Sequence, residues 1–147
     1  MTRKMFITVV MMAVSLQLFA QKAAVFSNAD GAIRGYDVVA YFTEGKPVKG
    51  NPELMYEWNE AKWYFSSTEN LNRFKENPEK YAPQFGGYCA YGLSEGHKAP
   101  TQPDAWTIVD NKLYLNYNTK VQVKWKEDRD ERIRKANQNW TELKNKE

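Results

Sequence analysis

The chain contains a single cysteine, Cys89, among its 147 residues. One cysteine cannot form a disulfide within the chain, so the fold must be held together by side-chain packing. Aromatic residues make up 14% of the sequence and include five tryptophans, and each of these rings can bury a large apolar area. The sequence therefore predicts a domain with an aromatic core and no internal cross-link.

The first twenty residues have the layout of a secretory signal peptide. Arg3 and Lys4 form a basic start, residues 5–16 are almost entirely apolar, and the small Ala20 stands at the expected cleavage position. The apolar stretch is shorter than the ~20 residues that span a bilayer. We expect residues 1–20 to be removed and the remaining protein to be periplasmic or secreted, without membrane attachment. The alternative is a buried N-terminal helix or a retained anchor.

The charge balance argues against nucleic acid as a partner. The full chain has 21 Lys and Arg residues and 18 Asp and Glu residues, and loss of Arg3 and Lys4 lowers the net charge from +3 to +1. Basic residues near the C-terminus alternate with acidic ones, which is typical of a solvated helix face rather than of a phosphate-binding stripe.

Two β-hairpins are expected from alternating apolar residues around turn residues. The first pairs residues 54–58 with 63–65, and the second pairs residues 106–109 with 113–117 around Asp110 and Asn111. Residues 33–42, which are rich in Val and Tyr, are expected to be extended as well.

Helices are expected in three places. Ser66 and Glu69 form a capping box that starts one helix, and Pro78 ends it at Asn77. Residues 78–82 form a short helical turn, and Asn118 or Thr119 caps the C-terminal helical region. In that region apolar residues recur at three- and four-residue steps, at Ile133, Ala136, Trp140 and Leu143.

These elements predict the fold class and the domain limits. We expect an α+β domain with a small antiparallel sheet made of two hairpins, a central short helix and C-terminal helices. The domain should cover residues 33–143, preceded by a flexible lead-in over residues 21–32.

Cys89 and the single histidine, His97, are the candidate metal ligands. A thiolate near an imidazole suits a soft metal such as copper, completed by other donors. Gly86 and Gly87 precede Cys89 and can let a helix start there with its amides pointing at the sulfur. The spacing of Cys89 and His97 matches no structural zinc motif, and a buried structural thiol and an exposed loop histidine are the alternatives.

Two further functions stay open at this point. Cys89 can instead be the nucleophile of a thiol-dependent enzyme or redox protein, which requires a lowered thiol pKa. The domain can also bind a small molecule or a protein without metal. No Ser-His-Asp set and no phosphate-binding loop is present, which favours a non-enzymatic protein. Asp37, between Tyr36 and Val38, is expected to be a capping or hydrogen-bonding carboxylate.

Several segments together resemble exported bacterial YHS-domain proteins. They are residues 35–42 (GYDVVAYF), 63–67 (WYFSS), 77–83 (NPEKYAP), 86–90 (GGYCA) and 112–117 (KLYLNY). The resemblance covers residues 33–140 and implies a small α+β domain and, by extension from broader YHS relatives, heavy-metal binding. Metal-binding relatives carry cysteines near the first strand and directly after the aromatic strand. This chain has Asp37 and Ser66 in these two regions.

Overall fold

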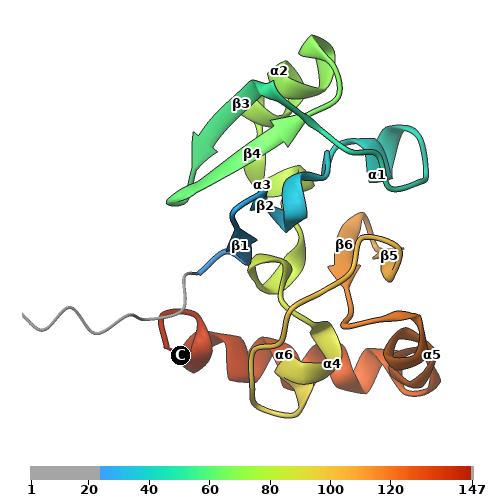
Figure 1. The fold of residues 1–147 in the computed structure, drawn as a ribbon. Coiled ribbons are helices and arrows are strands. Elements are labelled where there is room, and N and C mark those ends of the chain that lie inside the picture. Colours follow the sequence, from blue (N-terminus) through green and yellow to red (C-terminus); the bar gives the residue numbers. More distant parts are fainter. Residues whose placement is uncertain (1–23, 147) are drawn as a thin grey trace, which may run out of the picture.

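The computed structural model describes residues 24–146, and the expected signal peptide, residues 1–20, lies outside them. Figure 1 shows the strands and helices in chain order. The elements are β1 (Ser27–Asn28), β2 (Gly31–Ala32), η1 (Ile33–Gly35), α1 (Ala40–Thr43), β3 (Asn51–Trp58), β4 (Ala61–Phe65), α2 (Thr68–Glu76), α3 (Pro78–Tyr81), η2 (Gln84–Gly87), α4 (Ala90–Ser94), β5 (Trp106–Val109), β6 (Lys112–Leu115), α5 (Thr119–Glu127) and α6 (Arg129–Leu143). None of the helices in this part of the chain has the length and apolar character needed to cross a membrane.

The α+β fold class and both hairpins are confirmed. β3 pairs with β4 and β5 pairs with β6, each in antiparallel register, and a third pair joins the two-residue strands β1 and β2. Asn59 and Glu60 turn the first hairpin and Asp110 and Asn111 the second, all four with positive φ. Positive φ at both central positions is the turn geometry that matches the natural twist of paired strands.

The expected extended segment over residues 33–42 is wrong. Ile33 and Arg34 have φ values of 52° and 56°, which bend the chain into η1, and the segment ends in α1. Only Tyr36 forms a strand-like bridge, to Lys49. The segment turns into α1 because Asp37 accepts hydrogen bonds from the backbone N–H groups of Val39 and Ala40, which favours a helix start over a strand.

Helix α2 begins one residue later than the capping box predicts. Its N-cap is Ser67, whose hydroxyl accepts a hydrogen bond from the N–H of Asn70 at 3.1 Å. Ser66 is not free for this role because its hydroxyl donates to Asp37. The predicted end at Asn77, the short helix after Pro78 and the cap at Asn118 are confirmed.

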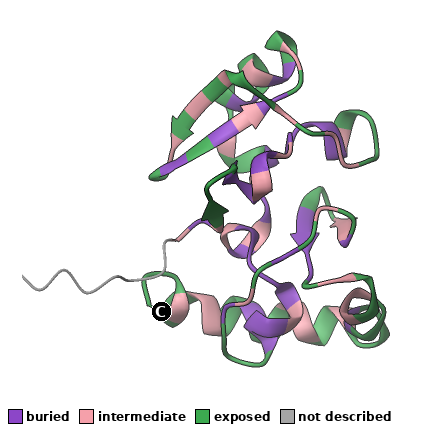
Figure 2. Cartoon of the chain, viewed as in Figure 1, coloured by how far each residue is buried: buried purple, intermediate pink, exposed green. Residues whose placement is uncertain are grey.

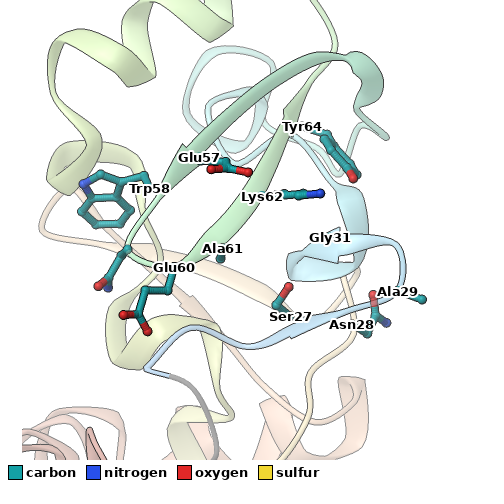
Figure 3. Close-up of a pocket in the computed structure, with 11 residues that line it drawn as sticks. Ser27, Asn28, Ala29, Gly31, Glu57, Trp58, Glu60, Ala61, Lys62 and Tyr64 are labelled. Atoms are coloured by element: carbon teal, nitrogen blue, oxygen red, sulfur yellow. The ribbon is translucent and has the colours of Figure 1, made fainter.

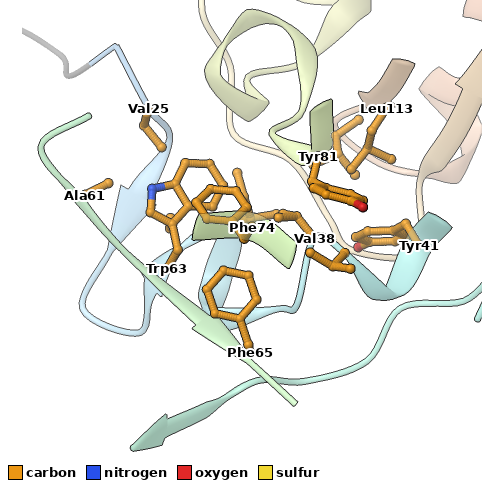
Figure 4. Close-up of a cluster of buried hydrophobic side chains, with 13 residues drawn as sticks. Val25, Val38, Tyr41, Ala61, Trp63, Phe65, Phe74, Tyr81 and Leu113 are labelled. Atoms are coloured by element: carbon orange, nitrogen blue, oxygen red, sulfur yellow. The ribbon is translucent and has the colours of Figure 1, made fainter. Parts of the chain in front are cut away.

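The core consists of two aromatic clusters. Figure 4 shows the first, in which Trp63 and Phe65 of β4 pack against Phe74 of α2. The second joins α4 to the C-terminal helices through Leu93, Trp125 and other residues, and it contains the predicted helix face at Ile133, Ala136, Trp140 and Leu143. Complete burial of one such side chain contributes about 2 kcal/mol. Figure 2 shows buried residues running through both halves of the molecule.

Residues 24–32, expected as part of a flexible lead-in, pack onto the folded chain. Val25 is 2% exposed and belongs to the first cluster. The N–H of Phe26 donates to the carbonyl of Gly86 at 2.8 Å. A Cβ at Gly86 would collide with the carbonyl oxygen of Ala24, so this close approach requires glycine.

Candidate functional site

Cys89 lies at the start of α4, at the position where an N-cap residue satisfies the first free amides of a helix. Its sulfur accepts hydrogen bonds from the N–H of Gly92 at 3.4 Å and from the N–H of Tyr117 at 3.2 Å. The expected amide directed at the sulfur is therefore present. The thiol is only 2% exposed, so the sulfur lies inside the fold.

Burial raises the pKa of the Cys89 thiol above its ordinary value. The amides of Gly92 and Tyr117 act in the opposite direction, because a hydrogen bond to sulfur favours the thiolate, but their effect is smaller. Cys89 is therefore a neutral thiol at pH 7. A reactive or metal-binding cysteine needs the thiolate form.

Asn116 is a partner of Cys89 that the sequence did not indicate. It is fully buried just after β6, and its Oδ1 accepts hydrogen bonds from the N–H of Tyr91 at 3.0 Å and from the Cys89 thiol at 3.6 Å. Its Nδ2 atom has no partner among the described residues. Cys89 and Asn116 thus join the start of α4 to the end of β6. No sequence motif predicts this hydrogen-bonded pair.

His97 is exposed in the loop after α4 and does not share the burial of Cys89. A Cβ added to Gly92 would lie 3.4 Å from the Nε2 atom of His97. The backbone N–H of His97 donates a hydrogen bond to the carbonyl of Gly92 at 3.0 Å. Cys89 and His97 therefore both adjoin Gly92. No group of three or more His, Cys, Asp or Glu side chains suited to a metal ion occurs in residues 24–146.

Asp37 is the most completely hydrogen-bonded acid in the first half of the described chain. Its Oδ2 accepts hydrogen bonds from the N–H of Ser66 at 2.9 Å, the hydroxyl of Ser66 at 2.7 Å and the side-chain amide of Asn70 at 2.8 Å. Its Oδ1 bonds the amides that begin α1. The prediction of a capping or hydrogen-bonding carboxylate is confirmed in its second form, and the side chain is fully buried.

An open groove lies between the β1–β2 turn and one face of the β3–β4 hairpin. It has a volume of about 560 Å³, and we call it the hairpin groove. Figure 3 shows Glu57, Lys62 and Tyr64 of the hairpin pointing towards the strand that carries Ser27 and Asn28. The lining residues are Ser27, Asn28, Ala29, Gly31, Glu57, Trp58, Asn59, Glu60, Ala61, Lys62 and Tyr64. Sequence reasoning did not find this groove, because its two walls come from separate hairpins.

Comparison with family models gives one match, to the YHS domain, over residues 39–85. A YHS domain is thus detected over about a third of the chain. Comparison with curated proteins and comparison with solved structures give no match. The YHS domain runs from the start of α1 to η2, so it includes the β3–β4 hairpin and ends before Cys89.

The residues of the YHS domain do not fit a soft-metal site of the kind that the resemblance implied. Residues 39–85 contain neither cysteine nor histidine. In the two regions where metal-binding relatives carry cysteines, Asp37 and Ser66 bond each other, and five hydrogen bonds in all satisfy the Asp37 carboxylate. A hydroxyl and a fully bonded carboxylate are poor ligands for a soft metal.

Proposed function

We propose that this protein is a non-enzymatic binding domain that holds a small polar ligand in the hairpin groove. The observation that supports it is the contrast between the two candidate sites. The groove is open and has a volume in the range of known ligand pockets, whereas the sulfur of Cys89 is buried and protonated. In this proposal Cys89 is a structural thiol that links α4 to β6.

The YHS domain provides most of one wall of this groove. Glu57, Glu60 and Lys62 of the β3–β4 hairpin are exposed, and none of their side chains makes a hydrogen bond or an ion pair within residues 24–146. Free charged groups that converge on a cavity are the usual means by which a pocket orients a polar ligand.

Blocking the groove tests the proposal. A panel of amino acids, sugars and dicarboxylates is added to the purified protein, and the melting temperature is measured, because a ligand that binds only the folded state raises it. At least one compound should stabilise the wild type and the control Lys46→Trp, and should have no effect on Ser27→Trp. The proposal is rejected if no compound acts, or if Ser27→Trp responds like the wild type.

A second candidate function is soft-metal binding at Cys89 with help from His97. The YHS domain is a type of domain associated with metal binding, and the two amide hydrogen bonds to the sulfur would also stabilise a thiolate ligand. Titration with copper should then give a bound equivalent that Cys89→Ser loses and His97→Ala weakens. Equal stoichiometry and affinity in the wild type and Cys89→Ser would exclude this candidate.

The remaining alternative is a thiol-dependent enzyme or redox protein with Cys89 as the nucleophile. Its test is the rate of alkylation by iodoacetamide as a function of pH. A midpoint at or above that of a free cysteine, about 8.5, would reject a nucleophilic role. The raised thiol pKa that burial causes supports that outcome.

We also propose that the protein is exported and that residues 1–20 are its signal peptide. The basic start and the apolar stretch of the sequence support this. The mass of the protein recovered from the exported fraction should correspond to a chain that begins at Gln21. A full-length mass would contradict export by cleavage.

A further inference from the structure

The proposed function leaves the chemistry of the ligand open, and the arrangement of charges in the hairpin groove narrows it. Glu57 of β3 and Lys62 of β4 are directly paired positions in the strand register. Side chains of paired residues lie on the same face of a hairpin, so the carboxylate and the ammonium group enter the groove side by side. Figure 3 shows both on the groove side of the hairpin.

These two charges remain available to a ligand. No ion pair within 4.0 Å links Glu57 to Lys62 in the described part of the chain. Glu60 adds a second carboxylate at the hairpin turn. The groove therefore offers two negative groups and one positive group, together with the Ser27 hydroxyl and the Asn28 amide.

The aromatic residues of the groove do not offer a flat surface for stacking. The ring of Trp58 packs against Trp63 and Phe74 in the core, and Figure 3 shows it directed away from Ser27 and Asn28. The ring of Tyr64 lies so close to Gly31 that a Cβ there would be 2.8 Å from it. With Trp58 turned towards the core and one edge of Tyr64 against Gly31, charge and hydrogen bonds are the main means of recognition in this groove.

We propose that the ligand is a small basic amino acid, with two ammonium groups and one carboxylate. The carboxylate would pair with Lys62, and the two ammonium groups would pair with Glu57 and Glu60. This charge pattern complements that of the groove, and charge-assisted hydrogen bonds of this kind are stronger than neutral ones. This inference rests on the proposed function, because it assigns a ligand class to the same groove.

Calorimetric titration with L-lysine tests the inference. Norleucine lacks the second ammonium group and cadaverine lacks the carboxylate, so each should bind about tenfold more weakly than L-lysine or worse. Binding of L-lysine should weaken as ionic strength rises, because exposed charges are screened by salt.

Three variants test which charged side chain of the groove binds which charged group of the ligand. Lys62→Met should weaken L-lysine binding about tenfold and should not weaken cadaverine binding, because it removes a positive charge from the site of a dication, whereas Glu57→Gln should weaken both. Glu53→Gln, on β3 but outside the groove, is the control and should bind like the wild type.

The possible outcomes separate the inference from the proposed function. If another compound binds and Ser27→Trp abolishes its binding, but L-lysine does not bind, the inference is overturned and the proposed function stands. If L-lysine binds equally to the wild type, Lys62→Met and Glu57→Gln, the inference is also overturned. If no polar compound binds, both the inference and the proposed function are rejected.

Discussion

The hydroxyl of Ser66 donates a hydrogen bond of 2.7 Å to the buried carboxylate of Asp37, twenty-nine residues away in the chain. The contact ties the end of β4 to the start of α1. It also explains why the helix cap moves to Ser67, because the Ser66 hydroxyl is already used. In the two regions where metal-binding YHS relatives carry thiols, this protein has a hydrogen-bond network that holds the fold.

The first prediction concerns this network. Asp37→Asn replaces one acceptor oxygen by an NH₂ group, which faces the donors of Ser66 or of the α1 start, and it removes the charge. Urea unfolding should show a loss of about 3 kcal/mol or more, because hydrogen bonds to charged groups are each worth about 1.5–3 kcal/mol. Ser66→Ala should cost about 1 kcal/mol. Asp130→Asn, at an acid that is 85% exposed, serves as the control and should change little.

The second prediction concerns pH. Since the folded pKa of Cys89 is raised, the unfolded chain loses the thiol proton first as pH rises above its ordinary value of about 8.5. The thiol therefore contributes stability that is fully present below that pH and is lost as pH rises through the folded pKa. The free energy of unfolding should fall more from pH 7 to pH 10 in the wild type than in Cys89→Ser. An equal fall in the two proteins would contradict the burial of a neutral thiol.

The third prediction compares two glycines with similar backbone angles. Gly86 and Gly45 have φ values of 62° and 66°, but a Cβ at Gly86 would meet the Ala24 carbonyl, whereas nothing lies within 4 Å at Gly45. Gly45→Ala should cost about 1–2 kcal/mol from the left-handed conformation. Gly86→Ala should cost more and should speed hydrogen exchange of the Phe26 N–H, which bonds Gly86. A similar loss of unfolding free energy in the two variants would contradict the close packing of residues 24–26 against Gly86.

The fourth prediction concerns Lys98, a lysine that is only 6% exposed. Its ammonium group donates to the carbonyls of Lys144 and Lys146 at 3.0 and 2.8 Å, and it lies over the rings of Tyr88 and Trp140. Lys98→Met leaves these carbonyls without their charged donor, so the unfolding free energy should fall by about 1–3 kcal/mol. Hydrogen exchange in the last turn of α6 should quicken, and the exposed Lys126→Met should leave it unchanged.

The hairpins and helices could be predicted because each depends on residues that are neighbours in the sequence. Asn118 caps α5 through an amide three residues away, and Asp110 and Asn111 turn a hairpin whose strands follow directly. Such signals are local, and the structure keeps the elements that they predict because the tertiary packing favours the same local conformations.

The failures in the first half of the chain have a different cause. Residues 33–42 have strand propensity, but Asp37 bonds Ser66 and Asn70, about thirty residues later, and this long-range network holds the carboxylate at the start of α1. The pairing of Cys89 with Asn116 is equally remote in sequence. The metal site expected at Cys89 and His97 stays a prediction that the copper titration tests.

The two sides of the hairpin groove lie on different sides of the YHS boundary. Glu57, Glu60 and Lys62 fall inside residues 39–85, but Ser27, Asn28 and Gly31 precede them. Asp37, which anchors Ser66 and Asn70, also lies just outside. A fragment cut at the YHS limits would thus lose both the opposite side of its binding surface and the carboxylate that joins its first helix to its second strand.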